Sequence, residues 1–237
     1  MNYLKSTAAV CMVLCGMGTA VAQEAAIRKN LAERLPNLPK IDEVSKTPMN
    51  GLYELRVNDS DIFYTDAEGN FLIQGVLIDA KSKRNLTEER TEKLNAIEFS
   101  SLPLKDAFTI VRGNGKRKMA VFEDPNCSFC KRFERDLQNV NDVTVHMFLY
   151  PVLGADSVEK TKNLWCAKDR SKAWLDAMVR DMPIAKATCD ASAIDRNRAF
   201  GTKYKITGTP TIFFADGSRV PGAISAAQVE KFLAEAR

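Results

Sequence analysis

The chain has 237 residues, of which 45% are hydrophobic and 27% are charged, a composition typical of a folded globular protein rather than a disordered or fibrous one. Its net charge of +4 is small and spread along the chain, and the short basic run at 116–118 is best interpreted as a solvated loop. Nothing here indicates nucleic-acid binding, so no nucleic-acid partner is expected.

The first 22 residues have the pattern of a secretory signal peptide. Lys5 supplies a positive start, an apolar stretch runs from Thr7 to about Val21, and Ala20-Val21-Ala22 fits the small-residue cleavage pattern. The apolar stretch is short for a membrane span, and no later segment is long and apolar enough to be one. We therefore predict an exported protein without a membrane span after cleavage. Only Lys5 is lost among the charged residues, so the mature net charge is 33 − 30 = +3.

Export changes the number of cysteines available for chemistry. Six are present in the sequence, but Cys11 and Cys15 leave with the signal peptide. An even number in an oxidising compartment indicates disulfides. Four cysteines allow three pairings, and the two-residue gap in Cys-Ser-Phe-Cys favours Cys127 with Cys130, which leaves Cys166 with Cys189.

Residues 23–82 are predicted to form a small α+β domain. Apolar residues at helical spacing predict a helix over 24–35, which Pro36 and Pro39 end. Three strand-like runs separated by polar turns follow, at 51–57, 61–65 and 70–78. A unit of about 60 residues has a thin core and gains much stability from pairing with a copy of itself. We therefore expect a dimerisation domain.

Residues 83–104 are predicted to form a helical linker. The helix is expected over 85–100, with Asn85 or Thr87 as its cap and acidic residues in its first turn. Apolar positions are sparse on a mostly charged surface, which suits a solvent-exposed spacer between domains. Pro103 would mark its end.

From residue 105 to 237, strands and helices alternate. Strands are expected at 108–112, 119–123 and 143–150, and helices at 127–140, 157–179 and 194–204. A hairpin over 211–215 and 219–221 turns at Asp216-Gly217, and a closing helix follows. This order indicates an α/β sandwich with a mixed sheet.

The redox chemistry is expected at Cys127-Ser128-Phe129-Cys130, which follows a strand and opens a helix. A thiolate attacks disulfides, and the unpaired N–H groups at a helix start favour an anion. We therefore predict that the pKa of Cys127 lies well below its ordinary value of about 8.5. Cys127 is expected to be the exposed attacker, and Cys130, one turn further in, to resolve trapped mixed disulfides.

Two other interpretations of this pair are a structural disulfide and half of a zinc site. A bridge across two residues closes too small a loop to stabilise the fold much. Zinc would need two more ligands at suitable spacing. The single histidine, His146, lies in an expected strand, and Cys166 and Cys189 better fit their own bridge. We therefore expect a redox pair, with no metal and no cofactor.

Thr209-Pro210 lies just before the apolar strand at 211–215. The simpler interpretation is an ordinary trans proline in a loop. The functional interpretation is a cis-proline that exposes the Thr209 backbone to a substrate strand. Together with the upstream cysteine pair, the functional interpretation becomes the stronger one.

The whole mature chain resembles the periplasmic disulfide isomerases of the DsbC/DsbG family, and the part from about Lys105 looks like a thioredoxin-fold domain. The matching motifs follow one another along the chain: Ile73-Gln74-Gly75, Phe122-Glu123-Asp124 before the cysteine pair, Trp165-Cys166-Ala167-Lys168-Asp169, Gly208-Thr209-Pro210 and Val220-Pro221-Gly222.

This resemblance implies a periplasmic homodimer, joined by its N-terminal domains, that holds misfolded exported proteins in an apolar cleft. It implies that Cys127 is the nucleophile, Cys130 its partner and Pro210 the cis-proline beside them, with Cys166–Cys189 as a structural disulfide. The working form would be reduced, maintained by an inner-membrane electron donor of the DsbD type. Substrate contacts are expected from Thr209, Pro210 and Phe129.

The chain departs from the family pattern in two places. The dipeptide between the cysteines is Ser-Phe instead of Gly-Tyr or Pro-Tyr, and these residues tune the redox potential. Ordinary thioredoxins carry a buried acid six residues before the first cysteine, where this chain has Val121. Glu123 or Asp124 could serve instead, but a turn or surface acid fits either position equally well.

The sequence therefore predicts an isomerase that reshuffles wrong disulfides in exported proteins, with chaperone activity from apolar cleft surface. Three alternatives stay open. A monomeric dithiol oxidase is disfavoured by the domain that precedes the catalytic one. A holdase chaperone would bind clients with little redox turnover. An exported interaction protein with a degenerate redox domain is disfavoured by the intact cysteine pair and Thr209-Pro210.

Overall fold

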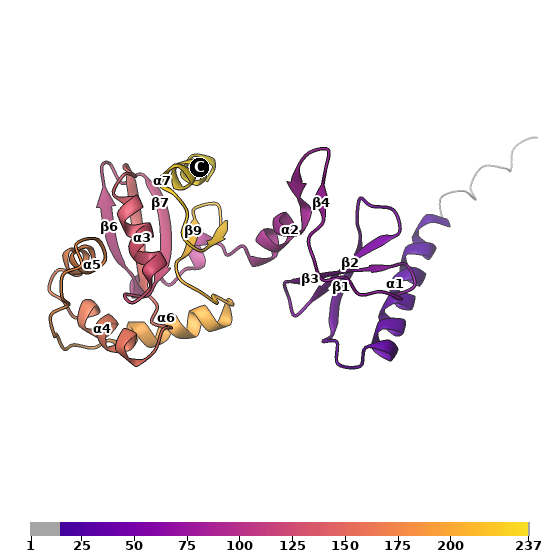
Figure 1. Cartoon of the computed structure of the whole chain (residues 1–237), viewed down its shortest axis with the longest axis horizontal. Helices are drawn as coiled ribbons and strands as arrows, with labels where there is room; N and C mark the ends of the chain where they lie inside the picture. Colours follow the sequence, from indigo (N-terminus) through magenta and orange to yellow (C-terminus); the bar gives the residue numbers. More distant parts are fainter. Residues whose placement is uncertain (1–14, 237) are drawn as a thin grey trace, which may run out of the picture. The chain divides into compact units, whose positions relative to one another are not determined.

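A computed structural model describes residues 15–236 and divides the chain into two compact units (Figure 1). The first unit ends at Leu94 and the second begins at Asn95. This division falls inside the segment that the sequence predicts as a linker. In the described part of the chain, no helix has the length and apolarity that crossing a bilayer requires.

The first unit packs one helix against a small antiparallel sheet. Ile27 and Leu31 on the helix are buried against Leu55 and Val57 on the middle strand. The strand order is β1-β2-β3. The elements are α1 (Cys15–Arg34), β1 (Ile41–Lys46), β2 (Leu52–Val57), β3 (Asp61–Asp66), the short hairpin of β4 (Ile78–Asp79) and β5 (Arg84–Asn85), and α2 (Leu86–Asn95).

The first predicted helix is confirmed over 24–34, and α1 also extends back to Cys15. The predicted signal peptide, 1–22, thus overlaps the start of α1, while its residues 1–14 lie outside the described residues. The sequence missed β1 because IDEVSK alternates too weakly between apolar and polar residues.

The predicted strand at 70–78 is wrong. Only Ile73 pairs, in a single bridge with Tyr64, before the two-residue strand β4. The Asp66 carboxylate accepts hydrogen bonds from the backbone N–H groups of Asn70 and Phe71 at 2.6 and 3.3 Å, which turns the chain here. A side-chain acceptor therefore replaces the strand pairing that apolar residues alone suggest.

The predicted helix at 85–100 is shorter in the structure, ending at Asn95. Asn85 caps it, since its Oδ1 accepts from the Glu88 N–H at 3.1 Å. None of its residues is buried, in keeping with the sparse apolar pattern. The chain then leaves the helix because Ile97 is buried in the second unit, where its N–H donates to the Gly217 carbonyl at 3.2 Å.

The second unit is a mixed sheet between two helical layers, as the sequence predicts. The strand order is β10-β9-β7-β8-β6, in which β7 and β8 are parallel and the other neighbours antiparallel. Its elements are the 3-10 turns η1 (Phe99–Ser101) and η2 (Leu104–Asp106), β6 (Phe108–Arg112), β7 (Arg117–Glu123), α3 (Ser128–Leu137), β8 (Val143–Leu149), α4 (Ala155–Trp165), α5 (Arg170–Val179), α6 (Ser192–Lys203), β9 (Thr211–Phe214), β10 (Arg219–Pro221) and α7 (Ala226–Glu235).

The two faces of β7 bury different clusters. Met119 and Val121 belong to the core formed with α3, α5 and α7, whereas Ala120 and Phe122 belong to the core formed with α6 and the segment around 97–107. Figure 1 shows α3 lying across the β6–β7 side of the sheet. Because side chains alternate along a strand, Glu123 points to the α3 face. This alternation positions the candidate site.

The helix predicted at 157–179 is two helices, α4 and α5. The second begins where the Asp169 carboxylate accepts from the Lys172 N–H at 2.9 Å, an N-cap in the middle of the predicted helix. Both tryptophans of this segment, Trp165 and Trp174, are buried, as expected of core residues.

α6 approaches the sheet closely at Gly201. A Cβ atom at this position would lie 2.4 Å from ring carbons of Tyr150. The Tyr150 hydroxyl in turn donates to the Ile206 carbonyl at 3.0 Å. The ring therefore fills the space that any other residue at 201 would need.

Candidate active site

The cysteine pair opens α3, as the sequence predicts. Cys127 is the N-cap residue, and its sulfur accepts a hydrogen bond from the Cys130 N–H at 3.3 Å. The Cys127 N–H donates to the Asp124 carbonyl at 3.0 Å, which fixes the turn between β7 and the helix. Both cysteines are free thiols. The arrangement is therefore the reduced form of a pair placed at a helix start.

The structure brings Thr209 and Pro210 against this pair. The Cys127 thiol donates to the Thr209 carbonyl at 3.3 Å, and the Thr209–Pro210 peptide bond is cis. Phe129, between the cysteines, is 56% exposed. Residues far apart in the sequence thus lie around the Cys127 sulfur, where Thr209 is half-buried and Pro210 is buried.

The two cysteines differ in burial. Cys130 is completely buried, and Cys127 is only 5% exposed. The expectation of an exposed attacker is therefore too strong: only a small part of the Cys127 side chain reaches solvent, and its sulfur lies against the Thr209 carbonyl.

The two thiols also differ in acidity. A hydrogen bond from the Cys130 thiol lowers the pKa of Cys127 to about 6; Thr209 and the N–H groups of Cys130 and Phe129 act in the same direction, whereas burial opposes them. Burial raises the pKa of Cys130 far above its ordinary value. At neutral pH the pair is therefore a Cys127 thiolate beside a Cys130 thiol, which is the division of roles that disulfide exchange needs.

We expect the thiolate absorbance of the reduced protein to rise with a midpoint near pH 6. At pH 7, one unit above that midpoint, about nine-tenths of Cys127 would be thiolate. Cys127→Ser should remove this transition, while Cys166→Ser/Cys189→Ser should keep it. A midpoint near that of a free cysteine, about 8.5, would contradict the assignment.

Asp124 and Glu123 are both fully buried, so the surface-acid interpretation is wrong for both. The Asp124 carboxylate accepts from the backbone N–H groups of Asn126, Val152 and Leu153 and from the Ser157 hydroxyl, at 2.7–3.0 Å. Through these four hydrogen bonds the Asp124 carboxylate holds the turn before Cys127 against the segment that leads into α4.

Sequence reasoning missed Glu134, which is also fully buried. It lies one helical turn after Cys130 on the buried side of α3, together with Phe133 and Leu137. Its spacing from Cys130 could have predicted its burial beside that thiol, because residues four apart lie on the same face of a helix.

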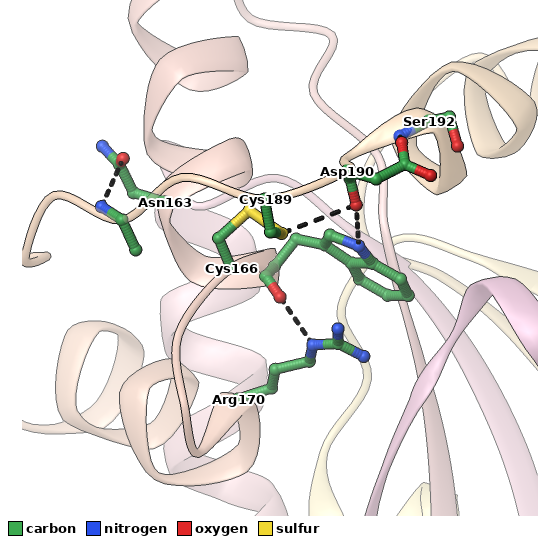
Figure 2. The surroundings of a disulfide bond; sticks show 8 residues. Asn163, Cys166, Arg170, Cys189, Asp190 and Ser192 are labelled. Carbon is green, nitrogen blue, oxygen red and sulfur yellow. Dashed lines mark hydrogen bonds between the residues drawn. A yellow bond between two sulfur atoms is a disulfide. The ribbon is translucent and has the colours of Figure 1, made fainter.

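Cys166 and Cys189 form a disulfide that holds a long segment without helix or strand, residues 180–191 (Figure 2). On either side of the bond, the Trp165 Nε1–H donates to the Asp190 carbonyl at 3.2 Å and the Ala187 N–H donates to the Asn163 Oδ1 at 3.1 Å. At the other end of this segment, Asp181 pairs with Lys131 and Arg135 of α3. The bond thus fastens a loop that also contacts the active-site helix.

Residues 104–237 match the family described as a thioredoxin-like domain, and residues 18–88 match the disulfide bond isomerase protein N-terminal domain. "Probable thiol:disulfide interchange protein DsbC" of Bordetella pertussis is 42% identical over 208 residues, which cover 88% of this chain and 73% of the relative. The chain belongs to the DsbC family. The thiol:disulfide interchange protein DsbC of Escherichia coli K12 is 30% identical over 225 residues, covering 92% of this chain and 90% of that DsbC protein.

A solved structure agrees with this membership. The crystal structure of a disulfide interchange protein from Neisseria gonorrhoeae is 38% identical, superposes with a TM-score of 0.54 and covers 56% of this chain and 97% of its own. This DsbC-family chain is therefore a thiol–disulfide oxidoreductase, built on a thioredoxin-like domain that follows the family's N-terminal domain. The predicted family, fold class and enzyme class are confirmed.

Proposed function

We propose that this protein isomerises incorrect disulfides in exported proteins, with Cys127 as the nucleophile and Cys130 as the resolving thiol. The observation that carries the proposal is the asymmetry of the pair. The pKa of Cys127 is lowered to about 6, whereas burial raises that of Cys130, so the pair holds a single reactive thiolate at neutral pH. A low thiol pKa favours both attack and later departure of the same sulfur.

In the first step, the Cys127 thiolate attacks one sulfur of a substrate disulfide. That disulfide breaks, and the other substrate sulfur leaves as a thiolate. In isomerisation, a different substrate thiolate then attacks the mixed disulfide and releases Cys127, so no electrons are consumed. In reduction, Cys130 attacks the Cys127 sulfur, and the protein is left oxidised with the substrate reduced by two electrons.

The surroundings of the pair support a protein substrate. The Thr209 carbonyl, which the Cys127 thiol contacts, is placed to receive a backbone N–H of an extended chain once that thiol ionises. Phe129 is 56% exposed, and Val152, Leu153 and Met182 are also exposed apolar side chains of the second unit. Apolar surface of this kind binds unfolded chains, which supports a substrate contact at Phe129 and a chaperone contribution. Thr209 would contact substrate through its carbonyl, and Pro210, which is buried, would position that carbonyl.

The first unit supports a homodimer. It exposes five large apolar side chains, each at least 48% accessible: Met49, Phe71, Ile73, Val76 and Ile78. Four of them lie in the stretch that forms little regular structure, 70–78. Exposed apolar residues grouped along one segment are typical of an interface, and a second copy of the chain would cover them.

The proposed setting is the periplasm, reached through a signal peptide at 1–22. In the proposed working form Cys127 and Cys130 are reduced while Cys166 and Cys189 stay bonded, the arrangement that the structure has. Each reductive turnover would require two electrons, for which an inner-membrane donor of the DsbD type is the proposed source.

The test is the recovery of activity from a scrambled multi-disulfide enzyme, with the protein supplied once reduced and once oxidised and no other redox agent present. A reduced isomerase should restore activity over several turnovers per molecule, whereas the oxidised form should restore little because it has no thiolate. A dithiol oxidase would show the opposite preference with reduced, unfolded substrate. Equal recovery in both redox states would favour a holdase and contradict the proposal.

A further inference from the structure

Two carboxyl groups lie buried beneath the active-site helix, and the proposed function so far uses neither. Glu123 ends β7, and Glu134 lies on α3 one turn after Cys130; both are fully buried. Strand alternation points Glu123 toward α3, and helix periodicity turns Glu134 to the same side as Cys130. The two acids and the Cys130 thiol therefore meet in the core between sheet and helix.

The two carboxyls have different partners. The Trp174 Nε1–H donates to the Glu134 Oε1 at 2.9 Å, and the Arg112 Nη2 lies 3.9 Å from the Glu134 Oε2. Neither oxygen of Glu123 has a donor at hydrogen-bonding geometry within the described residues. The groups that act on it are the Glu134 carboxyl and the thiols of Cys127 and Cys130.

Two facing carboxyls in a dry site cannot both ionise cheaply, so they hold at least one proton between them. Burial and the neighbouring Glu134 raise the pKa of Glu123 well above its ordinary value. Burial also raises the pKa of Glu134, but Trp174 and Arg112 oppose that change. The shared proton therefore resides on Glu123, beside a Glu134 carboxylate.

Cys130 needs a proton acceptor in the reductive step. Burial raises its pKa, and a backbone hydrogen bond from Asp124 only partly opposes that change, so loss of the Cys130 proton to water through the core would be slow. Asp124 is already fully engaged with four donors. Among the described residues, the carboxyl pair is the acceptor that faces this thiol.

We propose that Glu123 and Glu134 form a one-proton pair that takes up the proton of Cys130 when this thiol resolves the mixed disulfide. This inference rests on the proposed function. The Cys130 S–H proton moves to Glu123 as the proton of Glu123 moves to Glu134, and the Cys130 sulfur bonds to the Cys127 sulfur. The bond between Cys127 and the substrate breaks, and its electron pair leaves on the substrate sulfur, which takes a proton from water.

Glu123 contacts the reacting thiol and is a catalytic residue in this scheme, whereas Glu134 acts through it and is a positioning residue. Isomerisation by Cys127 alone needs no proton from Cys130. The carboxyl pair would therefore affect only the reductive step, in which Cys130 attacks the mixed disulfide and releases the substrate. During this step Cys127 is held in the mixed disulfide and does not ionise. The groups that would set the pH dependence of release are therefore Cys130 from the start of α3, Arg112 from β6 and the two acids themselves; α5 contributes the Trp174 N–H.

The experiment separates the two chemical steps in the full chain. Cys127 is first reacted with a disulfide reagent that leaves a coloured aromatic thiol attached to it, and the rate of attachment is recorded. Release of the coloured thiol then follows attack by Cys130. In Glu123→Gln, release should slow by about tenfold or more, within the range expected for loss of a general base, while attachment stays within about twofold of the parent.

The pH profile provides a second readout. Release in the parent should depend on the ionisation of the pair, and this dependence should disappear in Glu123→Gln and move to another pH in Glu134→Gln. Glu123→Asp keeps a carboxyl and should recover part of the rate. Glu159→Gln, at an exposed position on α4, is the matched control and should behave as the parent. If Glu123→Gln does not fold, the pH profile of release in Glu134→Gln still tests the proposal.

Two results would overturn the inference. One is release from Glu123→Gln at the parent rate with an unchanged pH profile. The other is an equal loss of attachment and release, which would indicate a distorted site. Failure of the proposed function looks different: the parent would then not form the mixed disulfide through Cys127, or would form and release it without restoring any scrambled substrate.

Discussion

Replacing Cys127 with serine should abolish disulfide exchange, lowering the rate of reactivation of a scrambled substrate by roughly three orders of magnitude or more, as expected when a nucleophile is removed. The variant keeps the fold, because serine at an N-cap also accepts the Cys130 N–H that the sulfur now receives at 3.3 Å. A serine hydroxyl is not ionised at neutral pH and does not attack a disulfide.

The matched variant is Cys130→Ser, and its expected behaviour is different. Cys127 can still attack, so the first step survives, but the route by which Cys130 expels a trapped substrate is lost. Covalent complexes with substrate should therefore accumulate and be visible by mass under non-reducing conditions. If Cys127→Ser also accumulates such complexes, or if it reactivates substrate as well as the parent does, the active-site assignment is wrong.

Removal of the Cys166–Cys189 bond should lower the free energy of unfolding of the second unit by about 3 kcal/mol, the loop-entropy contribution for a loop of this size. The two cysteines are 23 positions apart, and the enclosed chain includes residues 180–188, which form neither helix nor strand. Without the bond, this part of the loop would be held mainly by the hydrogen bonds at Asn163 and Trp165 and by the ion pairs of Asp181.

Urea denaturation of Cys166→Ala/Cys189→Ala, compared with the parent, measures this loss. The parent with its disulfide reduced should unfold at the same urea concentration as the variant, which controls for the alanine side chains. The near-neutral thiol titration of Cys127 should be kept, because no group that lowers its pKa belongs to this loop. A loss below about 1 kcal/mol would show that the loop is fastened by its other contacts.

The parts of the site that the sequence predicts are those encoded in short motifs. The position of Cys127-Ser128-Phe129-Cys130 can be predicted from its neighbours in the sequence, because a strand before the motif and helical spacing after it place the Cys127 sulfur at the start of a helix. The role of Thr209-Pro210 cannot be predicted from the dipeptide alone, because it lies beside the cysteine pair only when the sheet places β9 next to β7. Only the combination with the cysteine pair indicates that these distant residues meet.

The burial of Glu123 illustrates what the sequence leaves open. An acid directly after an apolar run fits the end of a strand in solvent as well as one covered by a helix. The difference is decided by α3, which starts only five residues later and folds back over the end of β7. Helix breaks are equally hard to foresee: α4 and α5 read as one periodic stretch, and a single cap at Asp169 divides them.

The contact between Gly201 and Tyr150 limits how this sequence can change over evolutionary time. Any side chain at 201 would push α6 away from the sheet, since the Tyr150 ring lies 2.4 Å from where its Cβ would be. Relief would require a smaller residue at 150, which would sacrifice the bond to Ile206 and empty a space between Phe122 and α6. Positions 150 and 201 are therefore expected to be substituted together or not at all. A protein that carries only one of the two substitutions would be destabilised.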